Sequence, residues 1–146
     1  MKFALSTFLL ALSVVVAGQD SDPNYGVISP ADGTTISQNT PLNLTFAPHR
    51  YFKESAKTID VFLLNGATTI SPKAGINAKQ VVSGMTPNIE VVYDGIQAQG
   101  YQVNIDLTQL SAPVPGDRTV LVKESFNGFG GVDSTNYWSQ TFSVTA

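Results

Sequence analysis

The 146-residue chain contains no cysteine, so neither a disulfide framework nor a thiolate metal site can hold its fold together. Its single histidine, His49, excludes a metal centre built on two imidazoles and leaves one conventional base for nucleophilic catalysis. No Gly-x-Ser-x-Gly motif accompanies His49, so we interpret it as an exposed loop residue. We therefore expect a fold that depends on apolar burial and backbone pairing alone.

Charged residues are also scarce, at 13% of the chain, and the lysines and arginines form no cluster. The formal net charge is −3, which makes nucleic acid and anionic lipid poor partners. The acidic residues are scattered singly, without the Asp-x-Asp-x-Asp-Gly spacing of a calcium loop. We therefore expect no metal, no cofactor and no nucleic-acid partner.

One apolar run covers residues 3–17, between Met1-Lys2 and the abruptly polar Gln19-Asp20. It is shorter than the roughly 20 residues that span a bilayer, and it ends in the small residues Ala17 and Gly18. We predict that residues 1–18 are a cleaved secretory signal peptide and that residues 19–146 form a single domain. The mature protein is expected to be secreted, extracellular or associated with a cell wall, without a membrane contact and without a lipid anchor.

Short β-branched and aromatic runs recur every 8–12 residues or so, separated by proline, glycine, asparagine and aspartate, while helix signals are nearly absent. In "PLNLTF" the apolar side chains alternate strictly with polar ones, and the segment 101–107 repeats this pattern. Counting a first strand at 25–28, we predict seven to nine strands. The fold class is therefore all-β, an immunoglobulin-like (fibronectin-type) antiparallel β-sandwich.

Two further local predictions concern turns and an edge. Asn65-Gly66 separates "IDVFLL" from "ATTI", which predicts a two-residue hairpin with positive φ at both turn positions. The segment 72–87 has the weakest strand pattern, so we expect a loop there that contains a short edge strand at 80–83.

Four segments in a fixed order resemble a known family: "VISPADGTTIS" at 27–37, then "LNLTF", "IDVFLL" and "LSAPVPGDRTVLVKES" at 110–125. They are similar to the Ig-like ectodomain of secreted and wall-associated fungal proteins, a group that includes the Ser/Thr-rich GPI-anchored family and yeast β-glucan assembly factors. The chain departs from that pattern at Phe46, where the family often has tryptophan, and at Asp117-Arg118-Thr119, where a tyrosine is common. The resemblance implies a fungal extracellular protein of cell-wall or host-surface context and carries over no catalytic residue.

Enzymatic activity is the least favoured class. A glycoside hydrolase needs two carboxylates at a set separation, and a single small sandwich offers little cleft for a substrate. We therefore expect no enzyme, with a small hydrolase as the outlying alternative. The acids available to it are Asp94, Asp106, Asp117, Glu124 and Asp133.

Binding through end loops is better supported, because sandwiches present their loops for recognition. The segment "HRYFKE" places Arg50, Tyr51 and Phe52 side by side, and aromatics beside a cation suit a carbohydrate face or a protein hot spot. The alternative for this segment is an aromatic side chain that covers the end of the sandwich.

The segment "FNGFGGVDSTNYWSQTF", residues 126–142, is the second candidate loop. The two-residue period places Trp138 on one face with Gln140 and Phe142, so Trp138 is expected to cap the core, and Phe126 is expected to point inward. The binding candidates that remain are Asn127, Phe129, Asp133, Asn136 and Tyr137.

Two surface features complete the set of candidates. Phe62, Leu64 and Leu121 are predicted to lie together on the outer face of one sheet, as a contact for a partner or a second copy, unless the loop at 72–87 covers them. Asn43, in Asn43-Leu44-Thr45, is the N-glycosylation acceptor of the sequence and is predicted to face solvent.

The sequence therefore favours a non-catalytic secreted protein that binds a cell-wall polysaccharide or an extracellular protein through its end loops. The alternative is a small secreted effector or structural wall protein that acts by protein contact or self-association.

Overall fold

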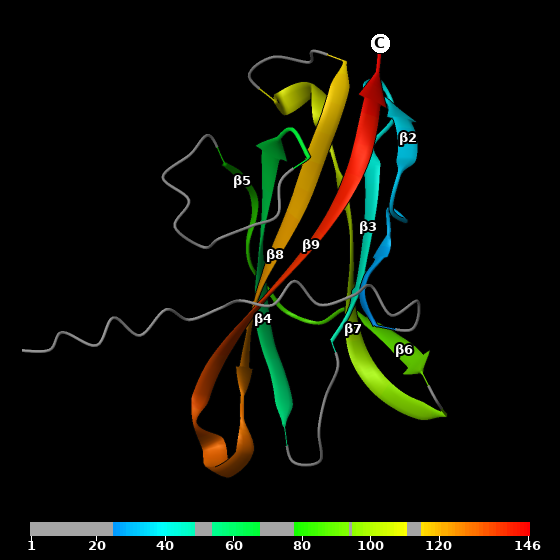
Figure 1. Cartoon of the computed structure of the whole chain (residues 1–146). Coiled ribbons are helices and arrows are strands. Elements are labelled where there is room, and N and C mark those ends of the chain that lie inside the picture. The colour runs from blue at the N-terminus through cyan, green and yellow to red at the C-terminus, as the bar shows by residue number, and fades with distance from the viewer. Residues whose placement is uncertain (1–24, 49–53, 68–77, 94, 111–114) are drawn as a thin grey trace, which may run out of the picture.

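The computed structural model describes residues 25–48, 54–67, 78–93, 95–110 and 115–146 of the chain. Two sheets pack face to face, so the predicted all-β sandwich is confirmed (Figure 1). The four-stranded sheet has the order β1 (Gly26–Ser29), β3 (Leu42–Ala47), β7 (Ile96–Ile105), β6 (Ile89–Tyr93). The five-stranded sheet has the order β2 (Thr34–Ser37), β9 (Asp133–Thr145), β8 (Gly116–Asn127), β4 (Ser55–Asn65), β5 (Lys79–Met85). Two short 3-10 turns are η1 (Leu107–Gln109) and η2 (Phe129–Gly131).

The strand order is that of an immunoglobulin-like domain. With β3, β4, β6, β7, β8 and β9 as strands B, C, D, E, F and G, one sheet reads A-B-E-D and the other contains G-F-C. The first strand is divided between the sheets, β1 in one and β2 in the other. β2 pairs with β9 in parallel, at one edge of a sandwich whose other described strand pairs are antiparallel.

The core lies between the sheets and follows the alternation seen in the sequence. Phe46 is fully buried, and its ring lies 5.9 Å from the ring of Tyr101 and 5.8 Å from that of Trp138. Such offset and edge-to-face pairs stabilise by about 0.5–1.5 kcal/mol each beyond their buried area. Around them pack the aliphatic residues Leu42, Leu44, Ile59, Val61, Leu63, Ile105, Val120, Val122 and Val144, together with Phe142.

Strands β8 and β9 form a long hairpin that runs the length of the sandwich. Their pairing extends from Gly116 opposite Val144 to Asn127 opposite Asp133. The turn that joins them is closed by two backbone hydrogen bonds, Gly128 N to Val132 O (2.7 Å) and Gly131 N to Gly128 O (3.0 Å). In Figure 1 this turn projects at the opposite end of the molecule from the C-terminus.

The two-residue hairpin predicted at Asn65-Gly66 is wrong. β4 pairs instead with β5, with Leu63 opposite Lys79, so the connection is much longer and residues 68–77 of it lie outside the described residues. Gly66 does adopt the expected positive φ, of 85°. Its N–H donates to Asp117 O at 2.8 Å, and its carbonyl accepts from Thr119 Oγ1 at 2.8 Å. Gly66 therefore links the end of β4 to β8 by two hydrogen bonds.

The edge strand predicted within 72–87 is confirmed and is longer than expected, since β5 covers Lys79–Met85. The Asp60 carboxylate on β4 holds it in place. Its Oδ1 accepts from Gly84 N at 2.8 Å and from Gln80 Nε2 at 3.4 Å. Among the described residues, no helix is long and apolar enough to cross a membrane.

Candidate functional site

The turn of the β8–β9 hairpin presents two large apolar side chains to solvent. Phe129 is 74% exposed and Val132 is 64% exposed. Gly130 and Gly131 adopt φ of 77° and 78°, a conformation that side chains disfavour, so glycine at these positions permits the tight reversal. The backbone bonds of the turn thus hold Phe129 and Val132 outside the core in a defined geometry.

Polar contacts surround the base of this turn. Lys57 Nζ lies 2.9 Å from Asp133 Oδ1, and Asn127 Nδ2 donates to Ser55 Oγ at 3.3 Å. Both contacts connect the start of β4 to the hairpin. The ion pair is largely exposed, so it contributes about 0–1 kcal/mol to stability, but it places a cation and an anion beside the apolar tip.

The structure places the five predicted loop residues on this hairpin, though not all in its turn. Phe129 lies in the turn, Asn127 ends β8 and Asp133 begins β9. Asn136 and Tyr137 lie within β9, opposite Glu124 and Lys123, so their prediction as loop residues is wrong. The backbone ladder extends five residues, 133–137, beyond Trp138, where the apolar alternation begins.

Val132 is not among the predicted binding residues. It follows two glycines and precedes the first paired residue of β9, so no strand phase directs it into the core. An apolar residue inside a glycine-rich turn is the signal that could have identified it.

The other predicted loop lies outside the described residues. Arg50, Tyr51 and Phe52, together with His49, fall between β3 and β4 in the sequence. The first residue of β4, Ser55, lies opposite Asn127. The chain therefore enters the sheet from this connection at the end that carries the hairpin turn.

Trp138, on β9 of the same hairpin, points into the core as predicted and is 8% exposed. Its ring meets that of Tyr25 edge to face at 6.1 Å. Its Nε1–H donates to Oε2 of Glu124 at 3.1 Å, and Glu124 is fully buried. Glu124 shares the inward phase of Val122 and Phe126 on β8, and Phe126 is buried as predicted.

The four candidate acids that the structure describes have structural partners. Asp106 Oδ1 accepts from the backbone N–H and the hydroxyl of Thr108, and Asp117 Oδ1 accepts from Ser143 Oγ at 2.6 Å. Asp94 lies outside the described residues. Within the described ranges no three His, Asp or Glu side chains gather as a metal site.

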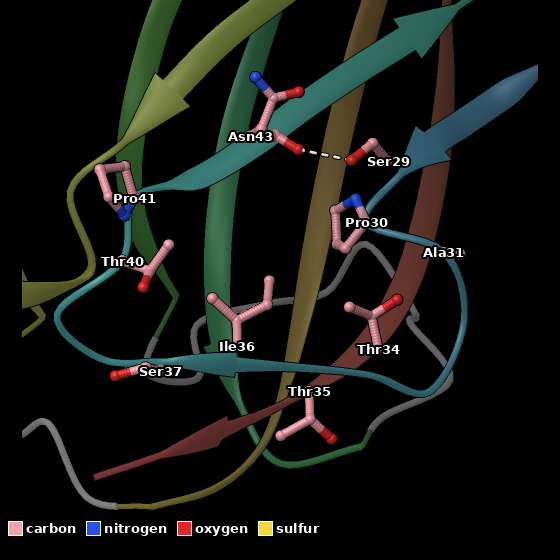
Figure 2. Close-up of a pocket in the computed structure, with 10 residues that line it drawn as sticks. All are labelled: Ser29, Pro30, Ala31, Thr34, Thr35, Ile36, Ser37, Thr40, Pro41 and Asn43. Atoms are coloured by element: carbon pink, nitrogen blue, oxygen red, sulfur yellow. Dashed lines mark hydrogen bonds between the residues drawn. The ribbon is translucent and has the colours of Figure 1, made fainter.

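A hollow of about 350 Å³ lies at the other end of the sandwich, where β2 faces the ends of β1 and β3 (Figure 2). At its rim, Ser29 Oγ on β1 donates a hydrogen bond of 2.8 Å to Asn43 O on β3. All ten lining residues are uncharged, so the hollow can accept a small neutral polar group but offers no acid or base. The lining residues are Ser29, Pro30, Ala31, Thr34, Thr35, Ile36, Ser37, Thr40, Pro41 and Asn43.

The predicted apolar patch is only partly present. Phe62 lies opposite Leu121, as expected, and Leu64 lies opposite Thr119. However, Leu64 is 8% exposed and Leu121 is 5% exposed, while Phe62 is half-buried. Alternation predicts the face on which a side chain lies and not whether that face is covered. The three residues form no exposed patch, which agrees with the alternative of a covered face.

Comparison with protein-family models and with curated proteins finds no match. The resemblance to fungal wall-associated domains therefore stays a prediction from the sequence. Of the candidate surfaces on the described residues, the hairpin turn combines exposed apolar side chains with a fixed backbone, and it is the best candidate for a binding site.

Proposed function

We propose that the protein is a non-catalytic secreted module that binds a cell-wall or extracellular surface component through the β8–β9 hairpin end. The observation that carries this proposal is the exposure of Phe129 and Val132 on a hydrogen-bonded turn. Removing apolar surface from water contributes a favourable free energy of about 25 cal/mol per Å². A polar turn would close the hairpin equally well, so the two apolar side chains indicate a surface that a partner covers.

The surroundings of the turn suit such a contact. Lys57, Asp133 and Asn127 supply a polar rim beside the apolar centre, as in recognition hot spots. Because the backbone of the turn is already closed, binding orders few additional groups, and the entropic cost of association is reduced.

The export part of the proposal is supported by the sequence of residues 1–18, and the wall context is supported by the resemblance of residues 27–125. The alternative function is a small effector or structural wall protein that acts by protein contact or self-association. It would use the same turn, because Leu64 and Leu121 are buried.

Retention on insoluble supports tests the proposal. The secreted protein is passed over β-glucan, chitin and whole fungal walls, the walls being used before and after protease digestion. Retention on glucan or chitin supports a polysaccharide ligand, whereas retention on walls that disappears after digestion supports a protein partner. Passage through every support, with concentration-dependent sedimentation of the free protein, would favour self-association.

A further inference from the structure

We propose that Asn43 carries an N-linked oligosaccharide whose first sugar is directed by Asn104 and Thr45 across the outer face of the four-stranded sheet. Asn43-Leu44-Thr45 is the one Asn-x-Ser/Thr segment, with x other than proline, in the 146 residues. The modification takes place on the export route, so it rests on the secretion part of the proposed function.

The acceptor amide is held from both sides. Asn43 is exposed on β3, and its Nδ2 donates to Oδ1 of Asn104, its register partner on β7, at 2.9 Å. Thr45 Oγ1 donates to Oδ1 of the same amide at 3.4 Å. The amide nitrogen has two hydrogens, so one can remain on Asn104 while a sugar replaces the other. These contacts fix the plane of the amide and hence the direction of the bond to the sugar.

The surface beside this amide is made of uncharged hydrogen-bonding groups. Gln102 lies opposite Thr45, and its Nε2 reaches Thr45 Oγ1 at 3.5 Å. Asn88 exchanges two hydrogen bonds of 2.8 Å with the backbone of Gln102. Amide and hydroxyl groups of this kind can bond to the hydroxyls of a sugar without removing a charge from water. Figure 2 shows the Asn43 amide pointing away from the hollow, so the sugar would cover the sheet face.

The covalent step requires a lipid-diphosphate-linked oligosaccharide, which the exporting cell supplies together with the transferase. The Nδ2 atom of Asn43 attacks the anomeric carbon of the first sugar and forms an N–C bond. The bond from that carbon to the diphosphate oxygen breaks, and the lipid diphosphate leaves with the electron pair. The amide gives one proton to a base of the transferase, and nothing is oxidised or reduced.

The modified face is far from the proposed binding turn. β2, which precedes β3, pairs with the C-terminal part of β9, from Phe142 to Thr145, whereas the hairpin turn adjoins Asp133 at the other end of that strand. A 13-residue strand is about 40 Å long. The oligosaccharide would therefore shield the four-stranded sheet and leave Phe129 and Val132 accessible.

Intact-mass analysis of the full chain, secreted from a glycosylating eukaryotic host, tests the modification. The wild type and the control Asn39→Gln, an exposed asparagine outside the acceptor motif, should each carry one oligosaccharide that peptide N-glycosidase removes. Asn43→Gln and Thr45→Ala should lose it completely. Secreted wild type without the oligosaccharide overturns the proposal and leaves export intact.

A second arm separates the two proposals. If the chain is retained in the cell, the export part of the proposed function is wrong, and the measurement is repeated with residues 1–18 replaced by the leader of a known secreted protein. Glycosylation at Asn43 in that chain supports the modification, and its absence overturns it.

The directing role of Asn104 has its own readout. Asn104→Asp keeps an acceptor oxygen, whereas Asn104→Ala removes it, and both chains should carry the same oligosaccharide. Nuclear Overhauser contacts between the protons of the first sugar and Gln102 should be present in the wild type and in Asn104→Asp and lost in Asn104→Ala. Equal contacts in all three proteins would overturn this role.

Discussion

The indole N–H of Trp138 donates a 3.1 Å hydrogen bond to the carboxylate of Glu124, diagonally across the neighbouring strands β9 and β8. Glu124 is fully buried and Trp138 nearly so. The bond satisfies the polar atom of the largest side chain in the core, which also packs against Phe46. This pair links the two strands of the hairpin within the core.

Glu124→Ala should lower the free energy of unfolding by about 1–3 kcal/mol, because it leaves a buried indole N–H without this acceptor. Glu124→Gln keeps an acceptor oxygen and nearly the same volume, so it should cost less. Urea unfolding followed by the fluorescence of Trp138, the one tryptophan of the chain, measures both. Equal losses for the two variants would show that the hydrogen bond is not the main contribution.

The edge strand β5 should depend on Asp60. Asp60→Ala removes the acceptor of Gly84 N–H, so the amide of Gly84 should exchange its hydrogen faster, while the global free energy of unfolding falls by about 1 kcal/mol. Asp60→Asn retains an acceptor oxygen and should exchange more slowly than Asp60→Ala. The control Lys123→Met removes only the partly exposed ion pair at 3.6 Å and should leave Gly84 unchanged. Faster exchange of the Gly84 amide in Lys123→Met would show that the ion pair with Lys123, and not the hydrogen bond from Asp60, protects this amide.

Gly100 is a position of close approach between β7 and its neighbours. A Cβ atom there would lie 2.7 Å from Val91 Cγ1 and 3.1 Å from the carbonyl oxygen of Phe46. Gly100→Ala should therefore destabilise the protein by about 1–3 kcal/mol through overpacking. The neighbouring exposed residue supplies the control, and Gln99→Ala should stay within about 0.5 kcal/mol of the wild type in thermal unfolding. An unchanged thermal stability of Gly100→Ala would mean that β6 moves to accommodate the added methyl group without a loss of stability.

Several parts of the fold follow from the two-residue period alone. The period places Leu42, Leu44 and Phe46 on the inner face, and it brings Trp138 into the core despite its position in an aromatic, glycine-rich segment. The same rule applies to Glu124, which shares the phase of Val122 and Phe126. Its place in the strand, and not its charge, therefore predicts that Glu124 is buried.

Other features depend on contacts between distant segments, which a local pattern does not contain. Asn65-Gly66 predicts a two-residue hairpin, but β4 pairs with β5, which lies further along the chain. The start of β9 is set by its ladder with β8, which places Asn136 and Tyr137 in a strand. The hollow beside Asn43 requires β1 and β2 to belong to different sheets, a division that neither strand's sequence indicates.

The most direct test of the central claim compares two valine substitutions of equal size. Val132→Ala alters the hairpin turn, and Val92→Ala alters β6 on the other sheet, where the valine is 66% exposed. Both should stay within about 0.5 kcal/mol of the wild type in unfolding. In binding isotherms on whole fungal walls, Phe129→Ala should weaken binding about tenfold or more and Val132→Ala should weaken it measurably, because hot-spot truncations cost more than about 1 kcal/mol. Val92→Ala should bind as the wild type does. Unchanged binding by both turn variants, or an equal loss in Val92→Ala, would contradict a binding function of the β8–β9 turn.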